Sequence, residues 1–209
     1  MKKDVPIIIT ISRQLGSGGA YIGHELSKAL QMDCFDKEIV LQAAKKLSVL
    51  EEDLASRDEK IPSFWESFFQ SNNFICPDVY LPTQAFVPTE EAIFNAESEI
   101  ITHIANERSA IIIGRCGAHI LRDNPHHISL FFHAEKKERL ERIEKLYGIT
   151  ADEAAKMIQQ SDEQRTRYHR LLTDKEWTDV TQYDFAINTS KISFDKMIPL
   201  ILSYLDARN

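Results

Sequence analysis

A glycine-rich turn near the start of the chain has the composition of a phosphate-binding loop. Residues 13–20 read Arg-Gln-Leu-Gly-Ser-Gly-Gly-Ala, and they follow an apolar, β-branched run at 5–11. Glycines let successive backbone N–H groups converge on one anion, and the N-terminus of a following helix adds its positive end. The residues expected to contact phosphate are Gly16, Ser17, Gly18 and Gly19. Glycines also suit any tight turn from strand to helix, so a purely structural role stays open.

This turn departs from the usual phosphate-binding pattern, G-x-x-x-x-G-K-[ST], at three positions. Arg13 replaces the first glycine, Gly19 replaces the lysine, and Ala20 replaces the hydroxyl residue that binds magnesium. Arg13 lies at the end of a predicted strand, and its planar guanidinium can grip phosphate oxygens at two points. We therefore expect Arg13 to take over from the lysine, the alternative being a salt bridge to a neighbouring acid.

Two more polar residues follow short predicted strands. Arg115 comes after the apolar run 110–113, where a guanidinium needs an anion or a carboxylate to balance its charge. It is therefore either a ligand-binding residue or half of a structural ion pair. Asp36 follows the run that begins at residue 32, and there it can simply cap the next helix, since Asp is a good N-cap residue.

Three arginines, Arg165, Arg167 and Arg170, fall within two turns of a predicted helix. They form either a cationic patch directed at a ligand or a solvated charged face. Asp162 and Glu163 lie on the same helix and can pair with them. Taken without the rest of the chain, the stretch favours the solvated face.

Strands that alternate with helices bring these residues to one edge of a sheet. Five short apolar runs are predicted strands, at 5–11, 32–36, 110–113, 128–132 and 184–188. Helix starts are predicted after the capping residues Ser48, Thr89, Thr150 and Ser193. The order predicts an α/β fold with a five-stranded parallel sheet and helices on both faces. Ligands of such sheets bind beyond the carboxyl ends of the strands, where Arg13, Asp36 and Arg115 are expected.

The string ITISRQLGSGG at 9–19 resembles the opening of the cytidylate kinase-like family, relatives of the nucleoside monophosphate kinases. That family's loop reads S-R-Q-x-G-S-G-G and lacks the usual lysine. Further similarity lies at 35–38, at 114–117, in the arginines after Asp162, and at 184–189. These blocks span somewhat more than half of the chain in the expected order, whereas residues from about 45 to 108 show no clear match.

The resemblance implies an ATP-dependent phosphotransferase with a P-loop NTPase-like three-layer fold, whose magnesium is held through the nucleotide phosphates. It implies catalytic roles for Arg13, Arg165 and Arg167, the latter two in a lid that closes over the transferring phosphoryl group. The substrate-binding residues that it implies are Asp36, Lys37, Arg115 and Arg170. The chain would be one kinase-like domain over 1–209, with a helical acceptor-binding insertion at about 38–108 and the lid at about 147–178.

Composition argues against several other classes. The net charge of -7 disfavours a protein that coats nucleic acid or an anionic membrane. The three cysteines form no CxxC pair, and the histidines show no metal-binding spacing, so a built-in metal is not expected. No apolar run approaches the ~18 residues of a membrane span, and the first one is too short for a signal peptide. A cytoplasmic protein is therefore expected.

Three functions stay open at this point. The first is a kinase that acts on a nucleoside monophosphate, cytidylate-like, or on a similar small acceptor that carries a phosphate. The second is a nucleotide-binding sensor without turnover, which the missing lysine and hydroxyl favour. The third is an interaction protein that binds a partner through the aromatic segment 64–74. The acceptor and the oligomeric state are not specified by these patterns.

Overall fold

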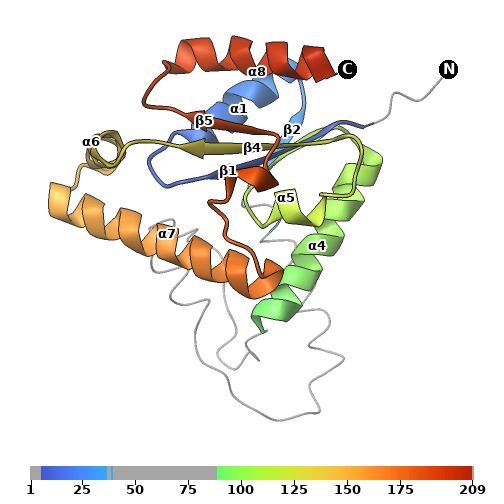
Figure 1. Ribbon diagram of the computed structural model, residues 1–209, viewed down its shortest axis with the longest axis horizontal. Coiled ribbons are helices and arrows are strands. Elements are labelled where there is room, and N and C mark those ends of the chain that lie inside the picture. Colours follow the sequence, from blue (N-terminus) through green and yellow to red (C-terminus); the bar gives the residue numbers. More distant parts are fainter. Residues whose placement is uncertain (1–5, 37–38, 40–88, 209) are drawn as a thin grey trace, which may run out of the picture.

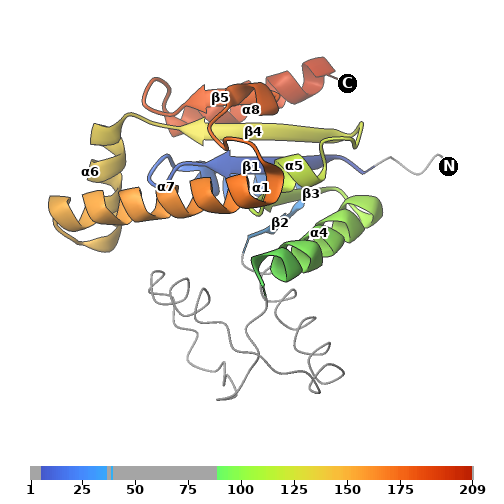
Figure 2. The same cartoon turned by 60° about the horizontal axis from the view of Figure 1, so that its bottom comes forward.

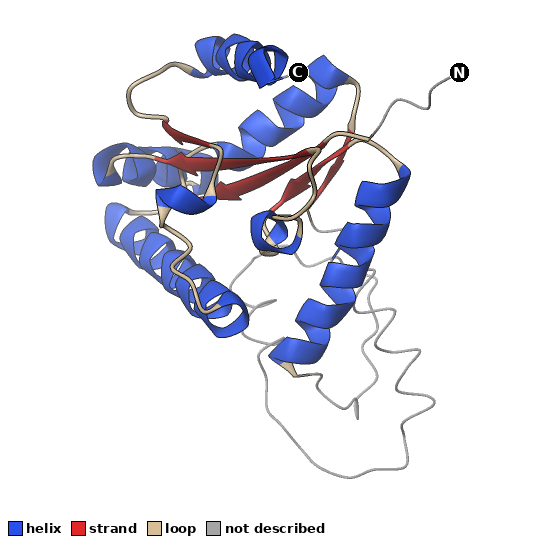
Figure 3. Cartoon of the chain, turned by 45° about the vertical axis from the view of Figure 1, so that its right-hand side comes forward, coloured by secondary structure: helices blue, strands red, loops and turns tan. Residues whose placement is uncertain are grey.

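A single parallel sheet forms the centre of the molecule. The computed structural model describes residues 6–36, 39 and 89–208 of the chain. Its strands are β1 (Ile8–Arg13), β2 (Asp33–Phe35), β3 (Ala110–Ile113), β4 (His127–His133) and β5 (Phe185–Asn188). They pair in the order β2-β3-β1-β4-β5, and every pairing is parallel (Figure 3). The predicted five-stranded parallel sheet is thereby confirmed, with small shifts at the strand ends.

Helices cover both faces of this sheet. They are α1 (Gly19–Leu30), α4 (Glu90–Glu107), α5 (Gly117–Ile120), α6 (Lys136–Tyr147), α7 (Ala151–Thr173) and α8 (Phe194–Arg208), with a 3₁₀ turn at Val180–Gln182. Helices α1 and α8 lie on one face, and α4, α5 and α7 lie on the other (Figure 1). Within the described residues, no helix is both long and apolar enough to cross a bilayer.

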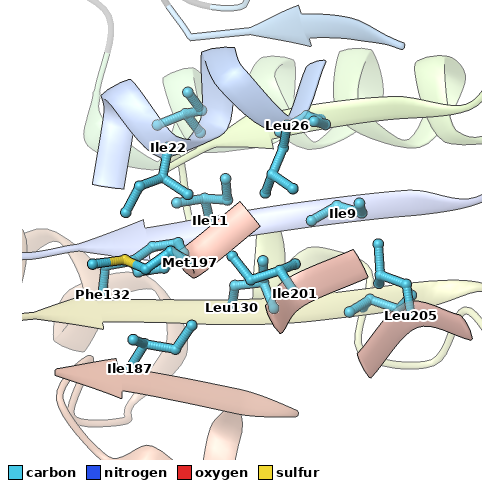
Figure 4. Close-up of a cluster of buried hydrophobic side chains, with 13 residues drawn as sticks. Ile9, Ile11, Ile22, Leu26, Leu130, Phe132, Ile187, Met197, Ile201 and Leu205 are labelled. Carbon is cyan, nitrogen blue, oxygen red and sulfur yellow. The ribbon is translucent and has the colours of Figure 1, made fainter. Parts of the chain in front are cut away.

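Alternate residues of β1 serve the two faces. Ile9 and Ile11 join the core under α1 and α8, whereas Ile8 joins the core under α4. Figure 4 shows the first core, in which the labelled side chains are Ile9, Ile11, Ile22, Leu26, Leu130, Phe132, Ile187, Met197, Ile201 and Leu205. Full burial of one such side chain contributes about 1.5–3 kcal/mol, so β1 is firmly fixed on both sides. The loop that follows β1 therefore starts from a rigid base.

Several predicted helix starts are present. The hydroxyl of Thr89 accepts a hydrogen bond from the N–H of Ala92 at 3.1 Å and caps α4. Thr150 and Glu153 form the predicted capping box of α7. Helix α8 begins directly after Ser193. The predictions for Ser48, the aromatic segment 64–74, Lys37 and most of the insertion at 38–108 lie outside the described residues.

Helices α6 and α7 form a hairpin beside the loop that follows β1 (Figure 2). The helices meet at Gly148, which ends α6 with a φ of 66°. Ile143 of α6 and Ile158 of α7 share a small apolar cluster in which Leu15 of the loop also packs. The loop is thus attached to this hairpin as well as to the sheet.

Candidate active site

The loop between β1 and α1 is a compact turn that leads into a helix N-terminus. Gly16 and Gly18 have φ values of 79° and 82°, which only glycine adopts without strain. Gly18 is the N-cap of α1, and its carbonyl accepts from the N–H of Ile22 at 3.0 Å. Ser17 is fully buried, and its Oγ donates to the carbonyl of Gln14 at 2.8 Å. A tight glycine turn that leads into a helix N-terminus can bind an anion, and whether this one does stays a prediction.

The carbonyl groups of this turn are held by two arginines of α6. Arg139 Nε donates to the carbonyl of Leu15 at 2.7 Å. Arg142 Nη1 donates to the carbonyls of Gly16 and Ser17 at 3.2 and 3.4 Å. Because these carbonyls point toward α6, the peptide planes of the loop are fixed. The N–H groups of the same peptides then point away from α6.

Arg13 occupies the space that a lysine at position 19 would need. A Cβ on Gly19 would lie 2.6 Å from the Cβ of Arg13, and a Cβ on Gly114 would lie 2.3 Å from its Nη1. The Arg13 side chain therefore packs directly against Gly19 and Gly114, where any side chain would collide with it. Its Nη2 lies 3.5 Å from Oδ1 of Asp36, so the predicted alternative, a salt bridge to a neighbouring acid, is present as a long contact.

Arg115 emerges from a sharp turn at the end of β3. Gly114, Arg115 and Cys116 all have positive φ, at 82°, 54° and 52°, and such strain in non-glycine residues is often found at functional sites. Nη1 of Arg115 lies 3.6 Å from Oε1 of Glu97 on α4. Glu97 is fully buried and accepts from the hydroxyl of Tyr168 at 2.7 Å. Burial raises the pKa of Glu97, while the charge of Arg115 opposes that rise.

Arg165 completes a group of guanidiniums at the carboxyl end of the sheet. Its Nη1 lies 3.3 Å from Oδ1 of Asp162. Burial and the charge of Arg13 lower the pKa of Arg165 to about 9, with Arg115 adding to the effect. Burial likewise lowers the pKa of Arg13, to which the charge of Arg115 also contributes. These three residues, Arg13, Arg115 and Arg165, are called the arginine cluster below.

The arginine cluster favours an anionic ligand. Its members are close enough for each to disfavour the charge of another, and they are largely removed from water. Each of them already lies near one carboxylate, Asp36, Glu97 or Asp162. An anion placed among them would add further negative charge and more hydrogen-bond acceptors. With the loop beside it, the cluster can bind phosphate groups from more than one side.

The other two arginines of α7 lie elsewhere. Nη2 of Arg167 pairs with Glu90 at 2.8 Å, and Nη1 of Arg170 pairs with Glu176 at 3.4 Å. Arg165 and Arg167 are two positions apart, which is about 200° around a helix, so they point in nearly opposite directions. The structure brings Arg165 to the loop but not Arg167 or Arg170, whose roles in lid closure and substrate binding stay predictions.

The described residues do not offer magnesium its usual protein ligand. Ala20 has no hydroxyl, and the hydroxyl of Ser17 is already used within the loop. Among the residues that the structure describes, no group of three or more histidine, cysteine or acidic side chains could hold a metal ion. The described residues are therefore compatible with magnesium that is carried on nucleotide phosphates.

Three residues of this site, Arg139, Arg142 and Glu97, were missed from the sequence. Arg139 and Arg142 lie three positions apart on a charged helix, so their common face was detectable, although its target was not. Glu97 lies in the apolar register of α4, between Ile93 and Ile104, where a carboxylate needs a partner. Asp162 was seen only as an alternative partner for the arginines of α7.

Comparison with known proteins identifies a family. The model of the cytidylate kinase-like family matches residues 8–191. A cytidylate kinase from Methanopyrus kandleri is 24% identical over 110 residues, which cover 49% of this chain and 57% of that relative, so the chain spans little more than half of its length.

Two solved structures show the same fold. An uncharacterized protein from Eubacterium ventriosum is 25% identical, with a TM-score of 0.68 and coverage of 96% of this chain and 98% of that one. Shikimate kinase from Bacteroides thetaiotaomicron covers the same shares, 96% and 98%, at 13% identity and a TM-score of 0.51. The second likeness bears on the fold alone.

Proposed function

The chain belongs to the cytidylate kinase-like family, and from that premise we propose that it transfers a phosphoryl group from ATP to a nucleoside monophosphate, cytidylate-like, or a similar small acceptor that carries a phosphate. The observation that carries this proposal is the arginine cluster beside the glycine loop. Phosphoryl transfer needs charge neutralisation and alignment of two phosphates more than covalent help. Three half-buried guanidiniums next to a helix N-terminus can supply both.

In this proposal the loop amides bind the phosphates of the donor. Arg13 takes the part of the missing lysine, because it ends β1 beside the loop and a side chain at position 19 would collide with it. Arg165 neutralises charge on the phosphoryl group in transfer, and Arg115 binds the acceptor phosphate, with Asp36 orienting the acceptor. Magnesium arrives with the nucleotide and helps to neutralise its phosphates.

The second candidate is a nucleotide-binding sensor. Its support is specific: Ala20 removes the metal-binding hydroxyl, and the Ser17 hydroxyl that could replace it donates to Gln14 instead. A protein that holds ATP in this loop without transferring phosphate would need the amides and Arg13 but not Arg165.

Binding and turnover separate the two candidates. Calorimetry would measure ATP affinity, and chromatography would detect diphosphate products from a panel of nucleoside monophosphates. We expect transfer to at least one pyrimidine monophosphate, with kcat lowered about 10²–10³-fold in Arg165→Ala. Lys156→Ala is the matched control, because Lys156 is an exposed cation on the same helix.

Each result has one interpretation. ATP binding without any product, in wild type and Arg165→Ala alike, would support the sensor. An absence of ATP binding in the wild type would contradict both candidates.

A further inference from the structure

The backbone of Leu15 is held at both of its polar groups by one pair of side chains. Its N–H donates to Oδ1 of Asp162 at 3.2 Å, and its carbonyl accepts from Nε of Arg139 at 2.7 Å. Nη2 of Arg139 also forms an ion pair with Oδ2 of Asp162. The three residues therefore close a ring of hydrogen bonds around a single residue of the loop.

This ring is shielded from water. The side chain of Arg139 is 8% exposed and that of Asp162 is 20% exposed. The Leu15 side chain packs in the apolar cluster between α6 and α7. A hydrogen bond to a charged group that is largely removed from solvent is stronger than an exposed one, and removing one partner leaves the other charge unbalanced.

The ring also fixes the direction of the neighbouring peptides. Because the N–H of Leu15 donates to a carboxylate, it is committed to the protein and not to an anionic ligand. The peptide planes after Leu15 then run into the turn at Gly16, whose own carbonyl is held by Arg142. The N–H of Ser17 donates to the carbonyl of Gln14 at 3.2 Å, so the loop N–H groups that can turn to an anion are those of Gly16, Gly18 and Gly19.

Asp162 connects this ring to the arginine cluster. The same Oδ1 that accepts from Leu15 also lies 3.3 Å from Nη1 of Arg165. One carboxylate thus sets both the shape of the loop and the place of a guanidinium that faces it. A displacement of α7 would move the two together.

We propose that Asp162 and Arg139 are positioning residues, which lock the phosphate loop to the α6–α7 hairpin in its anion-binding shape. The inference rests on the proposed function in one respect, the identity of the anion as a donor phosphate. The lock itself is a property of the protein without ligand. The α6–α7 hairpin and the loop then move as one body, and Asp162 acts through Leu15 and Arg165 without touching the substrate.

The test compares Asp162→Asn, Asp162→Ala and Arg139→Gln with the wild-type protein. Asparagine keeps an oxygen that accepts from Leu15 but loses the charge that Arg139 and Arg165 need, so it should retain part of the function. Asp152→Ala is the matched control, because Asp152 is an exposed acid in the first turn of the same helix. Thermal unfolding of each variant identifies any that is not folded.

Two readouts are taken. Amide hydrogen exchange without ligand should speed up in residues 14–18 of Asp162→Ala and Arg139→Gln, and less in Asp162→Asn. The dissociation constant for ATP should rise about ten- to hundredfold in Asp162→Ala, while KM for the acceptor changes much less. The double variant Asp162→Ala/Arg139→Gln should lose little more than either single one, because both act on Leu15.

The outcomes are distinguishable. Exchange in the loop that equals wild type in both Asp162→Ala and Arg139→Gln would overturn the lock, whatever the activity. Faster exchange in a protein whose wild type does not bind ATP would uphold the lock and contradict the proposed function. If Asp162→Ala does not fold, Asp162→Asn and Arg139→Gln decide by the same exchange measurement.

Discussion

At Gly114 the backbone has a φ of 82°, and a Cβ there would lie 2.3 Å from Nη1 of Arg13. The absent side chain at this position is what lets Arg13 reach past the end of β3. Gly19 plays the same part on the other side, where the usual lysine would meet the Cβ of Arg13. Two of the three departures from the usual loop pattern, Arg13 and Gly19, are therefore linked by packing. A side chain at position 19 would collide with Arg13.

Gly114→Ala is expected to displace Arg13. The left-handed backbone costs an alanine about 1–2 kcal/mol, and the new methyl group would also collide with the guanidinium. We expect kcat/KM for ATP to fall by at least about tenfold, through a higher KM, a lower kcat or both. The measurement is steady-state kinetics on folded protein.

Gly148→Ala controls for the backbone cost. Gly148 also has a positive φ, at 66°, but a Cβ there would meet nothing within 4 Å. It should lose stability to a similar small extent and keep full activity. Equal activities in the two variants would mean that Arg13 does not depend on Gly114.

Strands β1 and β4 are joined by one buried polar contact besides their backbone ladder. His127 begins β4, and its Nε2 lies 2.7 Å from Oγ1 of Thr10 on β1. Burial lowers the pKa of His127 to about 4, from an ordinary value of 6.5. Burial at this position therefore favours the neutral imidazole in the folded protein.

The stability of the sheet should fall as pH falls from about 6.5 to about 4. In that window His127 is protonated in the unfolded chain but neutral in the folded one. Its contribution therefore lowers the free energy of unfolding by up to ~1.4 kcal/mol for each unit by which the pH falls. His127→Gln should remove this part of the slope, as measured by urea unfolding. At pH 8 the imidazole is neutral in both states, so the difference there reports packing alone. An unchanged acid slope in the variant would contradict the assignment.

Across the whole molecule, the far end of α7 is fastened to α4 by two contacts of different character. Tyr168 donates to the buried carboxylate of Glu97 at 2.7 Å, and Arg167 pairs with Glu90 at 2.8 Å from a side chain that is 66% exposed. Through Glu97 the first contact also reaches Arg115. Docking of α7 on α4 therefore helps to hold the arginine cluster together.

Tyr168→Phe is expected to destabilise the protein by about 1–3 kcal/mol, because it leaves a buried carboxylate short of a donor. Arg167→Ala, one position earlier, should cost less than about 1 kcal/mol, since exposed ion pairs contribute little. Urea unfolding of the two variants at the same pH makes the comparison. A larger loss in Arg167→Ala would show that the exposed pair is the main link between the helices.

Local patterns in the sequence were sufficient for the architecture. Apolar runs and capping residues predict the strands and the starts of α4, α7 and α8, because each signal involves residues a few positions apart. The glycine turn was recognised for the same reason: Gly16 and Gly18 must bend the chain wherever the rest of it lies. The partners of individual side chains were not accessible in this way.

The sequence by itself determined that a parallel sheet ends in a glycine turn flanked by arginines, since hydrophobic period, helix caps and backbone freedom are local properties. Only the tertiary structure decided which arginine of α7 lies beside the glycine turn. The bond between Leu15 and Asp162 joins residues 147 positions apart, and Glu97 is bonded to Tyr168, 71 positions along the chain. Such pairs form because folding buries polar and charged groups together, and each buried group needs a partner. Which partner it finds depends on segments far apart in the sequence.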